Sequence, residues 1–131
     1  MASNLTTDMT DIPLVEDPSD LPPRIDYFIR RSMTLQIDDE LIEYTAIKTD
    51  APYAVLKCKR GACGTEPASH MAGAPVYHLK ECWGCFVPDG ETSLFSEVAD
   101  KISTAVNECG FDFVYLDGLD GAHVIGGEDA R

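Results

Sequence analysis

The sequence GFDFVYLDG at residues 110–118 decides the fold that we expect for this chain. Its apolar and aromatic residues from 111 to 116 are typical of a buried β-strand, and Gly110 is typical of a helix end. Between residues 93 and 109, apolar side chains recur at three- and four-residue spacing, which predicts an amphipathic helix. The residues expected on its apolar face are Leu94, Phe95, Val98, Ile102, Ala105, Val106 and Cys109.

A further strand is expected ahead of this helix, over residues 75–81. A strand, a helix and a second strand in this order predict a right-handed crossover that makes the two strands parallel. The carboxyl ends of parallel strands lie at one edge of a sheet, so we expect Glu81 and Asp117 to be neighbours there. Asp120 would lie close behind, and Asp89 would lie on the connecting loop.

A small antiparallel β module is predicted over residues 25–74. Apolar residues alternate over 33–37, and the segments 41–47 and 53–58 are rich in β-branched and aromatic residues. Turn-forming residues separate the three segments, which favours a three-stranded meander. We expect the loop 59–73 to be ordered, with one short helical turn.

The first 24 residues are predicted to be an extended or mobile lead-in, because prolines interrupt any regular structure there. Residues 12–15 are apolar and can anchor this lead-in to the body. The predicted class is therefore α+β, with an antiparallel β meander module followed by one strand-helix-strand (βαβ) unit over residues 75–131.

Length and charge narrow the functional classes. The chain has 131 residues, which suffices for one domain with a core. Its formal net charge of −13 argues against nucleic-acid and anionic-membrane partners, because their phosphates would be repelled. No apolar run approaches the ~18 residues of a membrane span, and the polar start does not fit a secretory signal. The cellular compartment stays open.

The acidic residues expected at the sheet edge predict hydrolysis of a glycosidic bond. Such enzymes pair an ionised carboxylate, which acts as nucleophile or base, with a carboxylic acid that donates a proton. We assign the first role to Asp117 and the second to Glu81 or Asp120. Sugar rings stack on aromatic side chains, which Trp83 and Tyr115 would supply. The structural alternative is that these acids, Asp89 among them, cap helix starts and keep loops hydrated.

The segment from Glu108 to Gly118 also resembles a barrel strand of carbohydrate-active (βα)8 enzymes, in the style of the α-galactosidase-like hydrolases. The resemblance covers residues 75–121 and implies that Asp117 matches the catalytic aspartate at the strand end. It also implies that His123 faces the cleft, with a carbohydrate as ligand, and we expect Asp89 on the connecting loop to contribute to substrate binding. A complete barrel needs roughly 200 residues or more. We therefore expect a piece or a shortened relative of such an enzyme, inactive alone, or a chain that completes its sheet by self-association.

A separate resemblance covers residues 33–78. The sequences DELIEY at 39–44 and CKRGACGT at 58–65 resemble a small β module of phage-tail proteins, which also occurs as an insert in large carbohydrate-active proteins. This resemblance implies a structural or docking role. The alternative function is therefore a non-catalytic interaction module whose contact surface includes the loop 59–73.

The cysteines offer a third interpretation. Cys82 and Cys85 have the two-residue spacing of redox pairs and zinc knuckles, and Cys58 and Cys63 could complete a four-cysteine zinc site. A redox pair usually lies at a helix start, whereas the helix expected here begins near residue 93. Free cysteine also often packs as a small apolar residue, so we expect no cofactor and keep zinc as the alternative.

Overall fold

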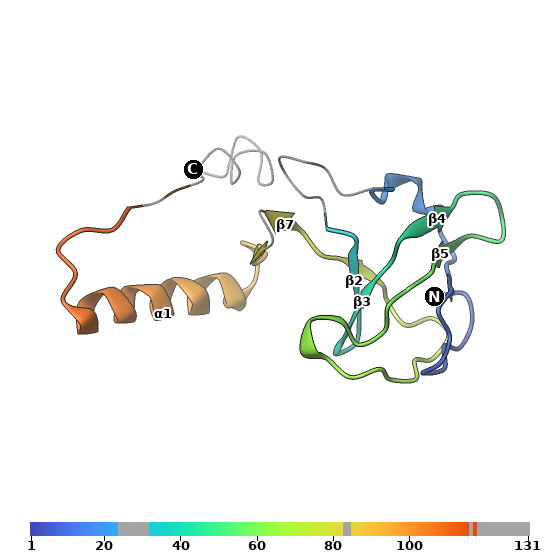
Figure 1. Cartoon of the computed structure of the whole chain (residues 1–131), viewed down its shortest axis with the longest axis horizontal. Helices are drawn as coiled ribbons and strands as arrows, with labels where there is room; N and C mark the ends of the chain where they lie inside the picture. Colours follow the sequence, from blue (N-terminus) through green and yellow to red (C-terminus); the bar gives the residue numbers. More distant parts are fainter. Residues whose placement is uncertain (24–31, 83–84, 116, 118–131) are drawn as a thin grey trace.

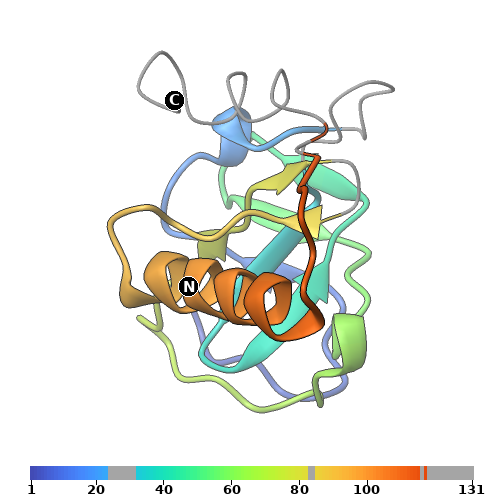
Figure 2. The ribbon, with the colours of Figure 1, turned by 90° about the vertical axis from the view of Figure 1, so that its left-hand side faces the viewer.

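The computed structural model describes residues 1–23, 32–82, 85–115 and 117. A β body, formed by the described residues up to 82, carries short strands packed closely together (Figure 1). One long helix, α1 (Ser93–Cys109), extends away from these strands. Seen from the helix side, α1 lies in front of the strands (Figure 2). The predicted α+β class is confirmed.

The strands of the described residues form three antiparallel sheets. The first contains β3 (Glu40–Glu43), β2 (Thr34–Ile37) and β6 (Tyr77–His78), in that order. The second contains β1 (Ile12–Pro13), β5 (Ala54–Leu56) and β4 (Ala46–Lys48). The third is a hairpin of β7 (Glu81–Cys82) and β8 (Cys85–Phe86). Two short 3₁₀ turns complete the described elements: η1 (Pro18–Asp20) and η2 (Ala62–Gly64).

The meander is present, but it is divided between two sheets. β2 and β3 pair through a tight turn in which Asp38 adopts the left-handed conformation, with φ of 50°. The strand expected over 41–47 is interrupted after Glu43, so that β3 pairs with β2 while β4 pairs with β5. Tyr44 lies at this break, and its hydroxyl donates to the carbonyl oxygen of Pro22 at 2.9 Å. The break lets one stretch of chain join both sheets.

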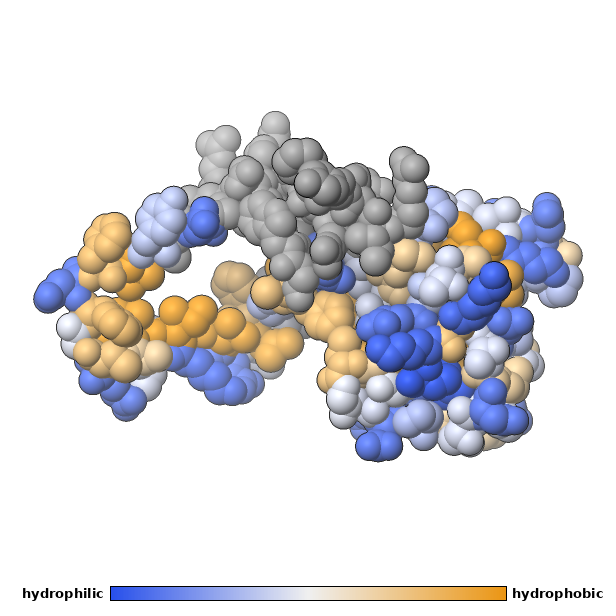
Figure 3. All heavy atoms as spheres, viewed as in Figure 1, coloured by the Kyte–Doolittle hydropathy of each residue, from blue (hydrophilic) through white to orange (hydrophobic). Residues whose placement is uncertain are grey.

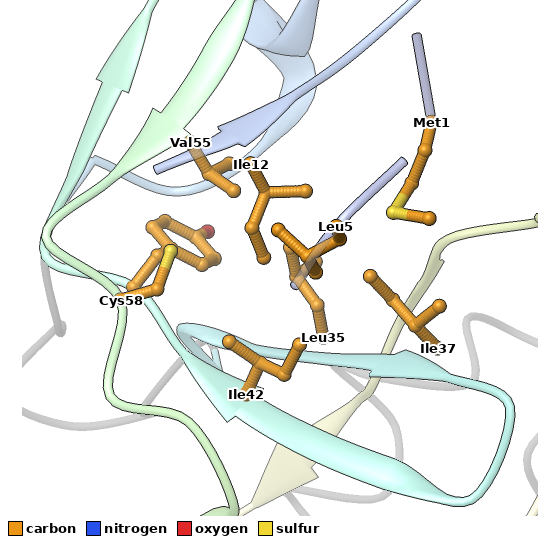
Figure 4. Packing of buried hydrophobic residues seen from close by; sticks show 9 residues of the cluster. Met1, Leu5, Ile12, Leu35, Ile37, Ile42, Val55 and Cys58 are labelled. Carbon is orange, nitrogen blue, oxygen red and sulfur yellow. The ribbon is translucent and has the colours of Figure 1, made fainter. Parts of the chain in front are cut away.

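The hydrophobic core lies entirely in the β body (Figure 4). Side chains alternate between the two faces of a strand, so every second residue of β2 and β3 points into this core. The buried cluster consists of Met1, Leu5, Ile12, Leu35, Ile37, Ile42, Tyr44, Val55 and Cys58.

The lead-in belongs to this body. β1 pairs with β5, as the apolar residues 12–15 suggested, and the backbone of Leu5 pairs with that of His70. Because Met1, Leu5 and Ile12 are core residues, the expected boundary at residue 24 does not separate the lead-in from the core. The ordered loop 59–73 with one helical turn is confirmed by η2.

Helix α1 has the predicted bounds, but the strand expected after it is missing. Gly110 ends the helix in the left-handed conformation, with φ of 68° and ψ of 36°. Residues 111–115 are not in a strand, and Leu116 lies outside the described residues. Ahead of the helix, β6 pairs with β2 in antiparallel fashion. The described residues therefore form no parallel strand-helix-strand unit, because the segment after α1 has no strand beside it to pair with.

Candidate functional site

Four charged side chains gather between the β2–β3 hairpin and the loop 59–73. Asp38 lies in the hairpin turn, Glu40 begins β3, and Arg60 and His70 lie on the loop. We call these four residues the Glu40 cluster. Three of their side chains are almost completely inaccessible to solvent: 0% of the Glu40 side chain is exposed, 1% of His70 and 6% of Arg60.

Glu40 is the centre of the cluster, because its carboxylate accepts five hydrogen bonds. Arg60 donates from Nε to Oε1 at 2.8 Å and from Nη2 to Oε2 at 2.7 Å, which is a bidentate ion pair. The backbone N–H groups of Gly61 and Ala68 donate at 2.9 and 3.0 Å. The fifth bond comes from His70 Nε2 at 2.7 Å. A buried carboxylate needs such partners, since leaving it unpaired is costly.

Arg60 connects this carboxylate to two other parts of the chain. Its guanidinium donates to the carbonyl oxygens of Thr6 and Met9, at 2.6 and 3.1 Å. It also donates to the carbonyl oxygen of Ala68 at 2.6 Å. One side chain therefore joins the N-terminal segment, β3 and the loop 59–73.

His70 lies between two carboxylates. Its Nδ1 is 2.7 Å from Asp38 Oδ2, and its Nε2 is 2.7 Å from Glu40 Oε2. Both ring nitrogens of His70 are therefore engaged by carboxylate oxygens, which hold the ring between the β2–β3 turn and the start of β3.

The electrostatics of Glu40 reflect this arrangement. Burial by itself raises the pKa of a carboxyl group, but here it is outweighed by the hydrogen bonds from Arg60, Ala68, His70 and Gly61. Together they lower the pKa of Glu40 to about 2. Glu40 is therefore ionised at neutral pH and cannot serve as a proton donor there.

Gly61 is required by the geometry of the loop. It adopts a left-handed conformation with φ of 61°, and its N–H points at Glu40. A Cβ atom at this position would lie 2.8 Å from the carbonyl oxygen of Thr65 and 2.7 Å from Cδ of Pro67. Neither the conformation nor the space suits another residue.

A shallow cavity of about 270 Å³ borders the cluster, and its lining includes Asp39, Thr65, Glu66 and Ser69. Asp38, Glu40 and His70 also line it. Glu40 and His70 are held by hydrogen bonds within the cluster, whereas the Asp38 side chain is 59% exposed. Among the described residues, no group of three His, Cys, Asp or Glu side chains is placed to hold a metal ion. The Glu40 cluster therefore serves to fix the loop 59–73 onto the β body.

The two predicted catalytic acids that the structure describes, Glu81 and Asp117, do not lie at one edge of a common sheet. Glu81 lies in β7, whose only partner among the described strands is β8, and Asp117 is exposed beyond a segment that is not a strand. Asp89 has a local role, because its Oδ1 accepts from the N–H of Glu91 at 3.0 Å. This matches the structural alternative for Asp89.

The predicted sugar-binding residues are only partly described. Tyr115 is 74% exposed and lies beyond α1. Trp83, Asp120 and His123 lie outside the described residues, so their predicted roles stay predictions.

The cysteines of the proposed zinc site have different surroundings. Cys58 is buried in the core, and this burial raises the pKa of its thiol to about 12. Cys63 is exposed on η2, and Cys85 is exposed on β8. The backbone of Cys82 pairs with that of Cys85 across the β7–β8 hairpin. Cys58 thus behaves as the buried apolar residue that we weighed as the alternative to zinc binding.

Sequence reasoning missed the Glu40 cluster, although a signal was present. Glu40 lies two and four residues before Ile42 and Tyr44, so strand alternation puts it on the same face as these two buried residues. Strand alternation therefore placed a carboxylate on the buried face, where it needs a cation or several hydrogen-bond donors as partners.

Comparison of the chain with protein-family models, with curated proteins and with solved structures gives no match. The resemblances to carbohydrate-active enzymes and to phage-tail modules therefore stay predictions. Within the described part of the chain, no helix combines the length and apolar character needed to cross a membrane.

Proposed function

We propose that this chain is a protein-interaction module, in which the β body carries a helical unit that packs on another polypeptide. The helical unit consists of α1 and residues 111–115. The observation that supports this proposal is the distribution of apolar side chains. The β body buries its large apolar residues, whereas α1 buries none of its residues.

Among the described residues, seven of the twelve large apolar side chains that are exposed belong to the helical unit. Leu94, Phe95 and Ile102 on α1 are 52–57% exposed. The residues after the helix are more open still, with Phe113 at 78% and Tyr115 at 74%. Contiguous apolar patches of this kind mark sites of interaction in soluble proteins.

The shape of the helical unit fits the same purpose. After Gly110 the chain reverses, and residues 111–115 run back toward the β body (Figure 1). Hydrophobic atoms line the side of α1 that faces this segment, with open space between the two (Figure 3). An isolated helix of 17 residues is only marginally stable in water, so packing on a partner would stabilise it.

Hydrogen exchange of the dilute, monomeric protein tests this proposal. We expect the amides of α1 to exchange close to the rate of an unfolded peptide, while those of β2 and β3 are protected by several orders of magnitude. Protection of α1 equal to that of β2 in the monomer would mean that the chain already covers the apolar face, and would contradict the proposal.

Sugar hydrolysis is a second candidate, favoured by one observation. Exposed Asp117 follows an apolar segment with an exposed aromatic residue, Tyr115, as in the strand of the α-galactosidase-like enzymes that the sequence resembles. Pairing of residues 111–115 with a partner strand would place Asp117 at a strand end.

The experiment uses 4-nitrophenyl α-galactoside and the protein at high concentration. Asp117→Asn should lower any hydrolysis rate by about 10²-fold or more, while Asp112→Asn should not. Equal rates in the two variants, or no hydrolysis at all, would contradict this second candidate.

A further inference from the structure

We infer that the polypeptide that packs on the helical unit is a second copy of this chain, through antiparallel pairing of residues 111–115 about a twofold axis at Phe113. This inference rests on the interaction function proposed above and identifies its partner. It is carried by the self-complementarity of the segment and by the apolar area that the segment and α1 expose.

The segment 111–115 is complementary to itself in one antiparallel register. With Phe113 opposite its own copy, Phe111 lies opposite Tyr115, and Asp112 lies opposite Val114. No carboxylate then faces another carboxylate, which would be destabilising in a directly opposed pair. All three aromatic residues fall on one face of the two-stranded ribbon, because side chains alternate along a strand.

This pairing would also give hydrogen-bond partners to backbone N–H and C=O groups of the segment. Residues 111–115 are neither helix nor strand, and they carry large apolar side chains. Asp112 forms a bend, and the N–H of Phe111 already donates to the carbonyl oxygen of Val106 at 3.2 Å, so the segment must straighten at Asp112 in order to pair. An identical segment then supplies matching donors and acceptors for residues 112–114. The aromatic face of the ribbon would then lie against the apolar faces of both α1 helices.

The exposed area matches what a stable dimer needs. Seven large apolar side chains of the helical unit are exposed, namely Leu94, Phe95, Ile102, Phe111, Phe113, Val114 and Tyr115. Val114 lies on the other face of the ribbon from the aromatic residues, so six of these side chains face the interface. At roughly 100 Å² each, they offer about 1,200 Å² over two copies, which is the lower end of the size range of specific interfaces.

Charge acts against association but does not prevent it. The acids of α1 include Glu97, whose carboxylate pairs with Lys101 at 2.7 Å in a solvent-exposed ion pair. The net charge of −13 per chain still makes two copies repel each other at long range. Because salt screens this repulsion, we expect the dimer to tighten when the NaCl concentration rises. A partner with a basic rim would show the opposite dependence.

Sedimentation velocity over about 1 to 100 µM tests the inference, since a modest interface has a Kd in this range. We expect a shift from monomer to dimer that strengthens with salt. Phe113→Asp brings two carboxylates together at the axis and should weaken association by at least about tenfold. Val15→Asp is the matched control, because Val15 is a 69% exposed apolar residue on the β body.

A charge-reversal pair tests the register itself. Phe113→Asp and Phe113→Lys should each be mainly monomeric, and their mixture should form a heterodimer, because Asp and Lys then meet at the axis. A mixture that stays monomeric, or an equal loss of association in Val15→Asp, would overturn the inference.

Hydrogen exchange separates this inference from the proposed function. Protection of α1 and residues 111–115 that appears only at dimer-forming concentrations supports both. If the protein stays monomeric at about 100 µM in high salt and α1 is unprotected, the inferred dimer is contradicted. The proposed interaction function is then still supported, with a different protein as the partner. A monomer with protected α1 overturns both.

Discussion

The β body and the helical unit carry apolar side chains at similarly regular spacing, but these side chains end in opposite environments. In β2 and β3, alternation brings Leu35, Ile37 and Ile42 into one core with exposed fractions of 0–1%. In α1, a regular helical pattern leaves Ile102 at 57% exposure. Periodicity therefore determines which element forms and which face is apolar. What covers that face depends on elements elsewhere in the chain or outside it.

Charged residues show the same contrast between the two parts of the molecule. In the β body, Glu40 and Arg60 form a buried bidentate pair within a hydrogen-bonded network. In α1, Glu97 and Lys101 form a solvent-exposed pair with side chains that are 58% and 74% exposed. The first pair holds distant segments together, whereas an exposed pair of the second kind contributes little to stability.

Removal of Arg60 should have the largest effect on the β body. Arg60→Met leaves the Glu40 carboxylate buried without its cation, and we expect the free energy of unfolding to fall by about 3–5 kcal/mol. Lys59→Met is the matched control, because Lys59 pairs with Glu43 on the surface and its loss should cost about 0–1 kcal/mol. Urea unfolding followed by near-ultraviolet circular dichroism measures both values. Equal losses would show that the cluster does not hold the body together.

Truncation of one isoleucine in each part tests the comparison directly. Ile42→Ala opens a cavity in the core and should lower the free energy of unfolding by about 2–5 kcal/mol. Ile102→Ala in the monomer should change it by less than about 0.5 kcal/mol, because the side chain is exposed. A large effect of Ile102→Ala on the melting of the monomer would place α1 against the β body.

Acid should unfold the β body through Glu40. The pKa of Glu40 is about 2 in the folded chain against an ordinary value of 4.5, so the folded state favours the ionised form. This stabilisation is fully present above pH 4.5 and is lost as the pH falls toward 2, by up to about 3 kcal/mol. Thermal melting between pH 7 and pH 2 measures it. In Glu40→Gln, the fall in melting temperature over this range should be smaller; an unchanged fall would assign the acid sensitivity to other carboxyl groups.

Local signals in the sequence were sufficient for helix α1 and for the β2–β3 hairpin. The helix bounds 93–109 and the left-handed Gly110 follow from apolar spacing and from the freedom of glycine at positive φ. The meander follows from alternation and from the Asp-rich turn at 38–39. Each of these features depends on residues that are close together in the sequence.

Contacts between distant residues were not predictable in the same way. Nothing local indicates that Leu5 pairs with His70, or that Arg60 reaches Glu40 rather than a surface acid. The expected strand at 111–116 has a suitable composition, but a strand also needs a neighbour, and the described residues offer none. Site predictions that depended on this strand, Asp117 and Glu81 above all, stay untested for the same reason.

The pairing of Leu5 with His70 has a consequence for synthesis of the chain. The N-terminal segment leaves the ribosome long before residue 70 has been translated, so its bridge partner does not yet exist. During that interval Leu5 and Ile12 would be exposed to chaperones and to other nascent chains. Contacts across such separations also slow a folding reaction, whereas the turns of α1 form within about a microsecond once they are made.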